Sequence, residues 1–491
     1  MFYIGIDLGT SACKMILADE KGNVLDTVSE EYPIYYPKTG WSEQNPTDWW
    51  NACLSGMEKL TANTDKTLIK GIGIAGQMHG LVVLDENDEV IRPAILWNDS
   101  RTAKQVDFLN ETVGKKTVSD CTGNIAFAGF TAPKLLWMKE NEPELFAKIS
   151  KIMLPKDYIV YRLTGVHSTD YSDASGMLLL DVQHKCWSKE MCEICGVREE
   201  QLPTLFESYE KVGEIQKSIA QTLGFGYNVV VCAGAGDNAA AAVGTGTVGN
   251  GKCNLSVGTS GTIFISSDTF GVDTNNSLHS FAHADGGYHL MGCMLSAAAC
   301  NKWWSEEILK TGDFEAEQKN ILPEKLGKNK VFFLPYLMGE RSPVNDTDAR
   351  GLFIGISADT TRADMTQAVL EGVAFAIRDS FEVAEKLGIK IKRSNICGGG
   401  SKSPLWKTIF SAVLGIPLDT VQTEQGPSYG GAILAMVACG EYKSVEEAVR
   451  AFVRITDTVY PDESLTALYN ERYERFKKIY PAVKNLYKEI K

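Results

Sequence analysis

Residues 4–14 read IGIDLGTSACK, an apolar run that ends on a carboxylate and passes at once into Gly-Thr-Ser. An acid without a partner is costly inside a strand, so Asp7 needs either a partner or a task. Gly9, Thr10 and Ser11 are poor strand formers, but they suit a tight turn whose backbone N–H groups point the same way. The stretch therefore predicts a strand that carries an acid to the mouth of an N–H-lined turn.

The residues around this turn predict one α/β unit. An amphipathic segment predicts a helix from about 46 to 60, with Thr47 or Asp48 as its N-cap. IKGIGIAG at 69–76 has the continuous apolar pattern of a buried strand. The strands predicted before the helix cover residues 2–7, 14–18 and 24–28.

The same device recurs about 250 residues later in the chain. VVVCAGAG at 229–236 predicts a buried strand, and Asp237 then opens an alanine-rich helix that runs to Val243. CNLSVGTSGTIFIS at 253–266 again predicts a strand, a Gly-Thr-Ser turn and a strand. A further strand at YHLMGCM and a helix from near Ser296 complete the second copy.

This repeat predicts an α/β fold of two similar lobes with a catalytic cleft between them. We place the N-terminal lobe at 1–246 and the C-terminal lobe, which includes the C-terminal helices, at 247–491. GTGTVG at 244–249 matches the dinucleotide pattern G-x-G-x-x-G, but it follows a predicted helix rather than a strand. We therefore reject a Rossmann site there and expect a hinge.

Two N–H-lined turns that face each other predict a nucleotide phosphate site, because such concavities bind phosphate without net positive charge. Glycine at positions 9 and 258 would let the backbone approach the anion closely. The alternative is a pair of ordinary hairpin turns. The residues predicted to bind phosphate are Gly9, Thr10, Ser11 and Lys14 in the first copy and Gly258, Thr259, Ser260, Gly261 and Thr262 in the second.

Two acids stand beside these turns. Asp7 can hold Mg²⁺ through water, because this ion keeps much of its hydration shell, and the alternative is a buried acid satisfied by a hydrogen bond. Asp237 follows a strand at the edge of a sheet where ligands bind, and its plain structural role would be a helix N-cap. As a catalyst it would accept the proton of an attacking hydroxyl.

Two polar loops in the first lobe follow apolar runs, GQMHG and LWNDSR. A single histidine is more often structural than functional, but His79 lies between glycines on the loop after a buried strand. Trp97 can lie flat against the apolar face of a small ligand. These loops predict a small-molecule site near the first turn.

A third glycine cluster, NICGGGSKSPLW at 395–406, ends a short predicted strand and precedes a helix over 404–414. Backbone without side chains there could admit a flat base, and GPSYGGA at 426–432 could close the other side of it. Either segment could instead be plain loop-to-helix packing.

Composition limits the classes of partner. The chain has 491 residues, of which 44% are hydrophobic and 23% charged, and its formal net charge is −13. No basic excess exists to neutralise phosphates, which argues against nucleic acid or an anionic membrane. No stretch approaches the roughly 18 apolar residues of a membrane span, and the N-terminus lacks the pattern of a signal peptide. We expect a cytoplasmic protein.

The twelve cysteines predict free thiols in a reducing compartment. One group, His184, Cys186, Cys192 and Cys195, invites a zinc reading because its last two members are spaced C-x-x-C. A second pair with metal-ligand spacing is missing, so we favour ordinary helical residues.

Taken together, GIDLGTS, GAGDNAA, SVGTSGT and GGGSKS resemble the FGGY carbohydrate kinases, which belong to the actin and Hsp70 ATPase superfamily. FTAPKLLWMKEN at 130–141 is similar to the first signature of that family, and GLFIGISADTTRADMTQAVLEG at 351–372 to the second. The resemblance runs from residue 1 to about 440. It implies two ribonuclease H-like, actin-like ATPase lobes.

WSEQNPTDWW, IAGQMHG, RPAILWNDSR, LPKDYIVYRLTG, TDYSDASGM and FLPYLMGERSP are similar to segments of family members that act on D-xylulose. The resemblance implies transfer of the ATP γ-phosphoryl group to the 5-hydroxyl of that sugar, with Mg²⁺ as cofactor, and it implies a homodimer. The matching residues are Asp237 as catalytic base, Asp7 with Asp237 linked to the metal through water, Met78, His79, Trp97 and Asn238 at the sugar, and Gly399, Gly400 and Ser403 at adenosine, while Thr408 replaces the Gln of other members.

Two alternatives stay open at this point. A kinase of the same family could act on ribulose, another ketose or a polyol. An actin-like module of a different class could hydrolyse ATP slowly without a sugar, although Asp237, Asn238 and His79 argue against it.

Overall fold

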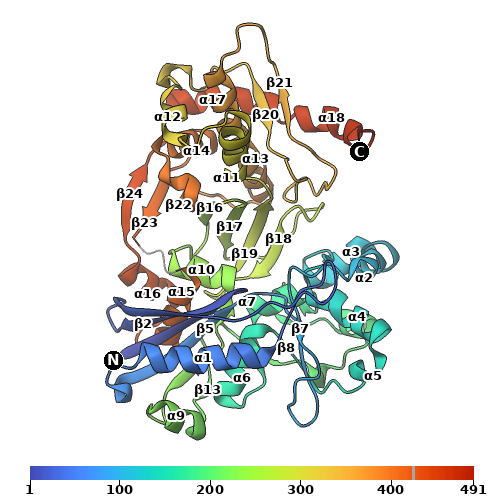
Figure 1. Ribbon diagram of the computed structural model, residues 1–491, viewed down its shortest axis with the longest axis vertical. Helices are drawn as coiled ribbons and strands as arrows, with labels where there is room; N and C mark the ends of the chain where they lie inside the picture. The colour runs from blue at the N-terminus through green and yellow to red at the C-terminus, as the bar shows by residue number, and fades with distance from the viewer. Residues whose placement is uncertain (423–425, 491) are drawn as a thin grey trace.

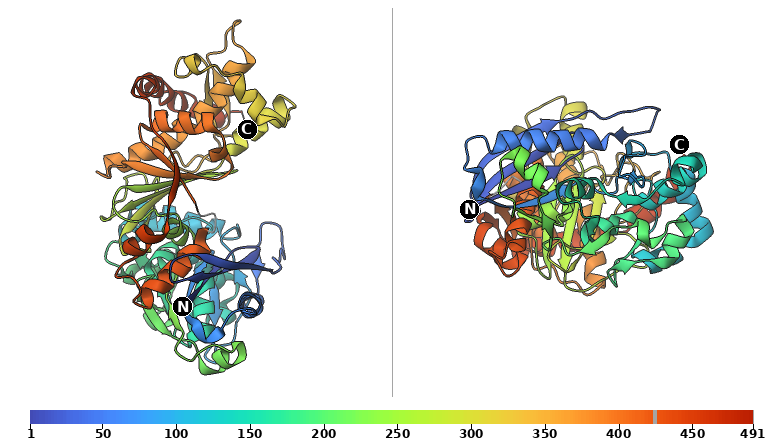
Figure 2. Two further views of the ribbon diagram at one scale, coloured as in Figure 1. Left: turned by 90° about the vertical axis from the view of Figure 1, so that its left-hand side faces the viewer. Right: turned by 90° about the horizontal axis from the view of Figure 1, so that it is seen from below.

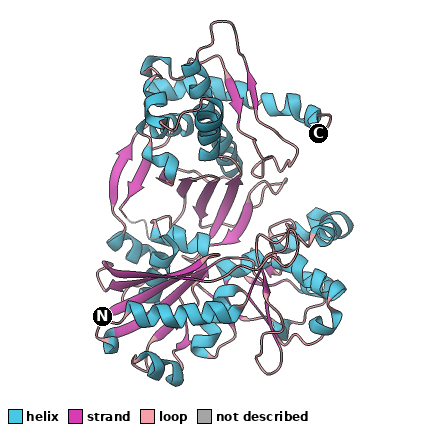
Figure 3. Ribbon diagram, in the orientation of Figure 1, coloured by secondary structure: helices cyan, strands magenta, loops and turns pink. Residues whose placement is uncertain are grey.

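Each half of the chain builds one seven-stranded sheet in the computed structural model, which describes residues 1–422 and 426–490. The sheets lie one above the other, with helices outside and between them (Figures 1 and 3). The described residues include no helix long and apolar enough to cross a membrane. The two-lobed α/β fold predicted from the repeated turn is thus confirmed.

The first sheet has the order β13-β14-β5-β1-β2-β3, and β15 also pairs with β5. The β1–β2 and β2–β3 pairs are antiparallel and β1–β5 is parallel, so the predicted meander and its neighbouring strand are both present. Its strands are β1 (Phe2–Leu8), β2 (Ala12–Asp19), β3 (Val24–Glu31), β5 (Ile69–Gly76), β13 (Lys211–Glu214), β14 (Val230–Cys232) and β15 (Ala235–Gly236).

The second sheet repeats this pairing, because β16–β17 and β17–β19 are antiparallel and β16–β22 is parallel. Its order is β18-β19-β17-β16-β22-β23-β24. Its strands are β16 (Lys252–Val257), β17 (Gly261–Ser267), β18 (His279–Ala282), β19 (Tyr288–Met294), β22 (Arg393–Cys397), β23 (Leu418–Val421) and β24 (Ile455–Val459).

Amphipathic helices bury one face of each sheet. Helix α1 (Pro46–Leu60) packs on β2 and β3, and α6 (Pro155–Thr164) packs on β5. In the second lobe α13 (Arg362–Lys386), α14 (Pro404–Leu414) and α17 (Glu463–Phe476) build the core with the sheet, and α18 (Ile479–Tyr487) follows.

Smaller elements fill the rest of each lobe. In the first lobe they are β4 (Glu43–Gln44), β6 (Val82–Leu84), β7 (Ala94–Ile95), α2 (Ala103–Asp107), α3 (Lys115–Thr122), α4 (Thr131–Asn141), α5 (Pro143–Phe146), β8 (Lys151–Met153), β9 (Ser168–Asp170), α7 (Tyr171–Ala174), β10 (Leu180–Asp181), β11 (Cys186–Trp187), α8 (Lys189–Cys195), β12 (Thr204–Phe206) and α9 (Lys217–Leu223). In the second they are α11 (Ala298–Lys302), α12 (Phe314–Lys319), β20 (Phe332–Leu334) and β21 (Leu352–Ile354).

Three local predictions are corrected by the structure. The N-cap of α1 is Asn45, whose side chain accepts from the Thr47 amide, and neither Thr47 nor Asp48 caps the helix. The strand predicted over 229–236 is interrupted at Gly234, where a Cβ would lie 1.9 Å from the Ile74 carbonyl oxygen. The helix expected from near Ser296 begins at Ala298 as α11.

The segment GPSYGGA is also corrected. It forms the start of α15 (Gly426–Ala438), which packs with α10 (Asp237–Gly244) against β1 and β5 of the first lobe. Helix α16 (Val445–Phe452) packs on α15, and both lie beside the blue strands in Figure 2. Most of this segment therefore covers the first sheet instead of closing a base pocket.

The close approach of α10 and α15 requires glycine, which has no side chain, where the two helices meet. A Cβ on Gly430 would lie 1.9 Å from the Ala240 carbonyl oxygen, so the backbones would have to separate. We expect Gly430→Ala to destabilise the protein by about 1–3 kcal/mol, the usual cost of overpacking, although alanine is the better helix former. Thermal unfolding measures the effect.

Gly312→Ala is the matched control, since its Cβ would meet nothing within 4 Å. The control should leave the melting temperature unchanged. If Gly430→Ala unfolded at the wild-type temperature, the close packing of the two helices would not limit stability.

Candidate active site

Two carboxylates, those of Asp7 and Asp237, lie on either side of β5, close enough for the charge of Asp7 to act on Asp237. Asp7 pairs with Ala75 of β5, and Ala75 pairs in turn with Ala235 of β15, two residues before Asp237. Burial raises the pKa of Asp7 to about 6, against the opposing charge of Lys14. Burial and the negative charge of Asp7 raise the pKa of Asp237 to about 7.

Asp237 is the first residue of α10, and Gly236 rather than Asp237 occupies the N-cap position. The Gly236 amide donates to the Ser172 hydroxyl at 3.2 Å, and this hydroxyl donates to Asp170. Asp170 in turn lies 2.9 Å from the buried Lys156 ammonium. Sequence reasoning missed this chain of contacts, although TDYSD places two acids and a serine together in an otherwise apolar region. It holds the backbone that carries Asp237.

The first turn directs its carbonyl groups away from the cleft. The Gly9 carbonyl accepts from the Tyr32 hydroxyl, and the Thr10 carbonyl accepts from Gln44 Nε2 at 2.7 Å. The amides of Thr10 and Ser11 donate no hydrogen bond to the part of the chain that the structure describes. These amides are therefore available to an anion.

The second turn is arranged in the same way. The Gly258 carbonyl accepts from the Ala298 amide at 2.8 Å, and the Thr259 carbonyl accepts from the Ala297 amide at 3.0 Å. Both donors lie at the start of α11, so the helix amides take up the carbonyl groups of the turn. Within residues 1–422 and 426–490, the amides of Thr259 and Ser260 have no hydrogen-bond acceptor.

Lys14 sits opposite Asp7 in the β1–β2 register and is half-buried. Its charge lowers the pKa of Asp7, which opposes the effect of burial. Its predicted reach to a phosphate oxygen stays a prediction.

The third glycine cluster lies beside the second turn. A Cβ on Gly400 would lie 2.5 Å from Val257 Cγ1, whereas a Cβ on Gly399 would meet nothing within 4 Å. Ser403 caps α14 by accepting from the Trp406 amide. The cavity here is about 940 Å³, and among its lining residues are Gly258, Thr259, Trp303, Phe314, Gln318, Gly399, Gly400 and Ser403. Its apolar walls suit a flat base.

A second cavity of about 740 Å³ adjoins the first and lies between the lobes. Asn238 and Thr245 line it from the first lobe, and Ser256 and Thr262 line it from the second. Gly399 borders both cavities, so the two are neighbours. The predicted departure Thr408 lies on α14, where its hydroxyl donates to the Pro404 carbonyl.

His79 is held in one orientation. Its Nδ1 lies 2.8 Å from the Gly176 carbonyl oxygen, which can only accept, so Nδ1 carries the proton and Nε2 is left as an acceptor. Burial lowers the pKa of His79 to about 3, and its ring stacks on Phe130 at 4.6 Å. The Lys134 ammonium donates to the His79 carbonyl at 2.7 Å. Lys134 was missed, although a lysine in the apolar run FTAPKLLW is a visible signal.

The other predicted sugar residues lie at the same place. Asn238 Nδ2 lies 3.9 Å from Met78 Sδ, and the Asn238 amide donates to Asp237 Oδ1 at 2.7 Å. Trp97 Nε1 donates to the Thr10 hydroxyl at 3.0 Å, and this bond joins the LWNDSR loop to the first turn. Trp97 is 48% exposed, so one face of its ring is open to a ligand.

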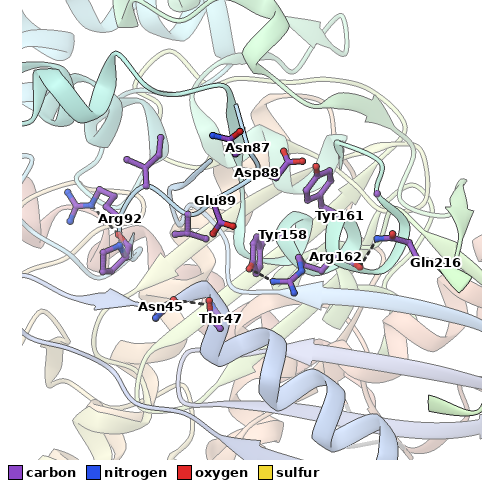
Figure 4. Close-up of a pocket in the computed structure, with 14 residues that line it drawn as sticks. Asn45, Thr47, Asn87, Asp88, Glu89, Arg92, Tyr158, Tyr161, Arg162 and Gln216 are labelled. Carbon is purple, nitrogen blue, oxygen red and sulfur yellow. Dashed lines mark hydrogen bonds between the residues drawn. The ribbon is translucent and has the colours of Figure 1, made fainter. Parts of the chain in front are cut away.

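A further hollow, of about 780 Å³, lies on the first lobe, and none of the predicted site residues lines it (Figure 4). Two of its charged side chains form ion pairs, Arg92 with Glu43 and Glu142 and Asp88 with Lys151, and Arg162 donates to the Tyr158 hydroxyl. We therefore assign it no chemistry.

The cysteine group is not arranged as a metal site. Cys192 and Cys195 are buried on α8 and burial raises the pKa of both thiols, while His184 pairs with Asp181. No cluster of three or more metal-ligating side chains occurs among the residues that the structure describes. Cys192 and Cys195 are helical residues as predicted, whereas Cys186 lies in β11 and His184 in a turn, which corrects the prediction for those two.

Comparison with known proteins gives concordant matches. Residues 2–244 match the N-terminal domain model of the FGGY family of carbohydrate kinases, and residues 253–439 match its C-terminal domain model. The chain is 40% identical over 480 residues to the xylulose kinase of Escherichia coli K12, covering 97% of this chain and 98% of that protein.

Solved structures match over nearly the whole length. A xyloylose kinase from Brucella ovis has a TM-score of 0.93 and 38% identity, covering 99% of this chain and 100% of that one. A gluconate kinase from Lactobacillus acidophilus has a TM-score of 0.92 and 27% identity, covering 100% and 99%. The fold therefore has the actin-like, two-domain architecture of these kinases.

The raised pKa of Asp237 predicts a pH-dependent cost to stability. Asp237 keeps its proton up to about pH 7 in the folded protein, whereas in the unfolded chain it loses the proton at its ordinary pKa of 3.8. The contribution of this group to stability is therefore fully present below about pH 4 and is lost as the pH rises through about 7. Asn is neutral at every pH. We expect Asp237→Asn to melt above the wild type at about pH 8, by a margin that grows between about pH 4 and 7 and then stays constant.

Asp26→Asn, which removes an exposed carboxylate, is the control and should show no such growth with pH. A melting difference for Asp237→Asn that did not change with pH would contradict the burial argument.

Proposed function

The chain belongs to the FGGY family of carbohydrate kinases, and on that basis we propose that it transfers the γ-phosphoryl group of ATP to the 5-hydroxyl of D-xylulose. Relatives that carry the name xylulose kinase at 40% identity over almost the full length support the sugar. The observation that carries the reaction is the half-buried carboxylate of Asp237, which lies close enough to Asp7 for that charge to raise its pKa and precedes Asn238, a residue that lines the cavity between the lobes.

Asp237 acts as the general base. A pKa near 7 leaves a substantial ionised fraction at neutral pH and makes the carboxylate basic enough to take the proton of the 5-hydroxyl as that oxygen attacks phosphorus. The contacts from Gly236 through Ser172 hold the carboxylate in place, which suits a reaction that depends on positioning. His79 Nε2 and Asn238 orient the sugar, and Trp97 covers its apolar face.

The two turns hold the phosphates of ATP. The amides of Thr10 and Ser11 in the first lobe and of Thr259 and Ser260 in the second donate to no described residue, so they are available to negative charge that develops on the transferring group. The adenosine moiety occupies the cavity beside Gly399, where a wall without side chains admits the base. Lobe closure about the hinge near residue 245 then excludes water, which would compete with the sugar hydroxyl.

Mg²⁺ fits the donors at this site. Asp7 and Asp237 supply hard oxygen ligands. Burial raises the pKa of both carboxyl groups, and the charge of Asp7 raises that of Asp237 further, so the two ionised carboxylates are costly until a divalent cation neutralises them. Asp7 would hold the ion, with Asp237 linked through water. When bound, the ion neutralises charge on the phosphoryl oxygens.

A gluconate kinase of nearly the same fold keeps a second substrate class open, as do the ribulose and polyol kinases considered above. We favour D-xylulose because relatives with 33% to 40% identity over nearly the whole chain carry the name xylulose kinase. The cytoplasmic location and the homodimer stay predictions.

Coupled ADP release with MgATP across a sugar panel tests the substrate. We expect D-xylulose to give a rate far above D-ribulose, L-ribulose, gluconate, glycerol and the reaction without sugar. A higher rate with another member of the panel would replace the substrate and keep the reaction. A flat panel with slow background hydrolysis would contradict the kinase assignment.

Two isosteric variants separate the roles of the acids. We expect Asp237→Asn to lower kcat by at least a factor of about 100 at any Mg²⁺ concentration, because general base catalysis contributes that much or more. Asp7→Asn should raise the Mg²⁺ concentration needed for half-maximal rate. Calorimetry should show ATP binding within a few fold of wild type for Asp237→Asn.

Loss of ATP binding in Asp237→Asn would make this residue part of the nucleotide site or of the fold. An unchanged Mg²⁺ dependence in Asp7→Asn would remove Asp7 from the metal site.

A further inference from the structure

The segment MGERSP, at 338–343, fixes an arginine at the edge of the cleft. The buried Glu340 carboxylate accepts from the Leu295 amide at 2.9 Å and from the Arg341 amide at 2.8 Å. The Ser342 amide donates to the Cys293 carbonyl at 2.9 Å. The backbone of Arg341 is therefore bound to the end of β19 in the second lobe.

The side chain of Arg341 reaches the first lobe. Its guanidinium carbon lies 4.6 Å from the ring centroid of Phe127, in the loop before α4. Phe127 packs edge-on to Phe130, on which the His79 ring is stacked. The positive charge lowers the pKa of both His79 and His279, so Arg341 lies within electrostatic range of the sugar loop.

Direct bonds between the lobes hold this arrangement. Asn124 Nδ2 donates to the Ser280 carbonyl at 2.8 Å, and the Ser280 amide donates to Asn124 Oδ1 at 3.1 Å. Asn124 belongs to the first lobe and Ser280 to β18, the edge strand of the second sheet. The position of Arg341 relative to His79 is therefore set by the Asn124–Ser280 bonds between the lobes together with the contact of Arg341 with Phe127.

Apart from its contact with the Phe127 ring, the guanidinium has no partner among the described residues. It forms no hydrogen bond and no ion pair with any described residue, although burial lowers the pKa of this half-buried side chain. A partly buried cation without a partner is costly, and a guanidinium offers five donors in a rigid plane. His79 Nε2 nearby offers an acceptor. Planar donors beside an acceptor and aromatic rings match a molecule with several adjacent hydroxyl or carbonyl oxygens.

We propose that Arg341 is a sugar-binding residue supplied by the second lobe, whose guanidinium donates hydrogen bonds to oxygen atoms of the sugar held at His79. The proposal rests on the proposed function, since it concerns the acceptor of the same reaction. Because His79 and Arg341 belong to different lobes, the bound sugar joins the lobes and favours the closed cleft. Sugar is thus a ligand of both lobes, and not of the first lobe alone.

Steady-state kinetics and calorimetry of Arg341→Gln and Arg341→Lys test this. We expect Arg341→Gln to raise KM for D-xylulose at least about tenfold, as loss of a charge-assisted hydrogen bond implies, and to change KM for ATP less than twofold. Calorimetry without nucleotide should show the same loss of sugar affinity. Arg341→Lys should recover part of it, because lysine keeps the charge and loses the planar fork.

Arg198→Gln is the matched control. Arg198 is an exposed arginine that pairs with Glu200 and is not one of the residues assigned to the sugar site. It should match the wild type in both KM values. If Arg341→Gln melts well below the wild type, the kinetics of Arg341→Lys are used as the test instead. An unchanged KM for sugar in a folded variant, or a parallel rise in both KM values, would overturn the role of Arg341.

Failure of the proposed function would appear in the wild type instead, as turnover of another sugar or of none. If another sugar is the substrate, the same comparison is made with that sugar.

Discussion

Asp7 and Asp237 lie on either side of β5 in one sheet, where burial makes both charges costly and the charge of Asp7 adds to the cost of Asp237. An ordinary core would replace one of them with an apolar residue. Here the surroundings hold both in place, because Lys14 stands opposite Asp7 and the contacts from Lys156 to Gly236 fix the backbone of Asp237. The result is a raised pKa for both acids, and perturbed pKa values of this kind are typical of residues that act as a metal-binding acid or a general base.

The two turns solve one problem by different contacts. Side chains of Tyr32 and Gln44 bind the carbonyl groups of the first turn, whereas the amides at the start of α11 bind those of the second. In both cases donors of the protein occupy the peptide carbonyls, and the amides of the turn donate to no described residue. A protein with a net charge of −13 can therefore present a site suited to phosphate.

Local patterns predicted much of this architecture. The hairpins, the parallel strand after each and the start of α10 follow from short-range periodicity and turn chemistry. The packing of α15 on the first sheet did not follow, because it depends on glycines some 350 residues apart in sequence, such as Gly73 and Gly431. The contacts of Lys156, Lys134 and Arg341 were missed for the same reason. The fold brings Lys156 to Asp170, Lys134 to the His79 carbonyl and Arg341 to Phe127, and these partners are distant in sequence.

A crystal structure with D-xylulose and a non-hydrolysable MgATP analogue tests the central claim most directly, which is that Asp237 takes the proton from the sugar. The predicted result places the 5-hydroxyl within hydrogen-bonding distance of the Asp237 carboxylate and in line with the γ-phosphorus, with the phosphates between the two turns. A 5-hydroxyl bound elsewhere, with Asp237 in contact only with nucleotide or metal, would contradict it.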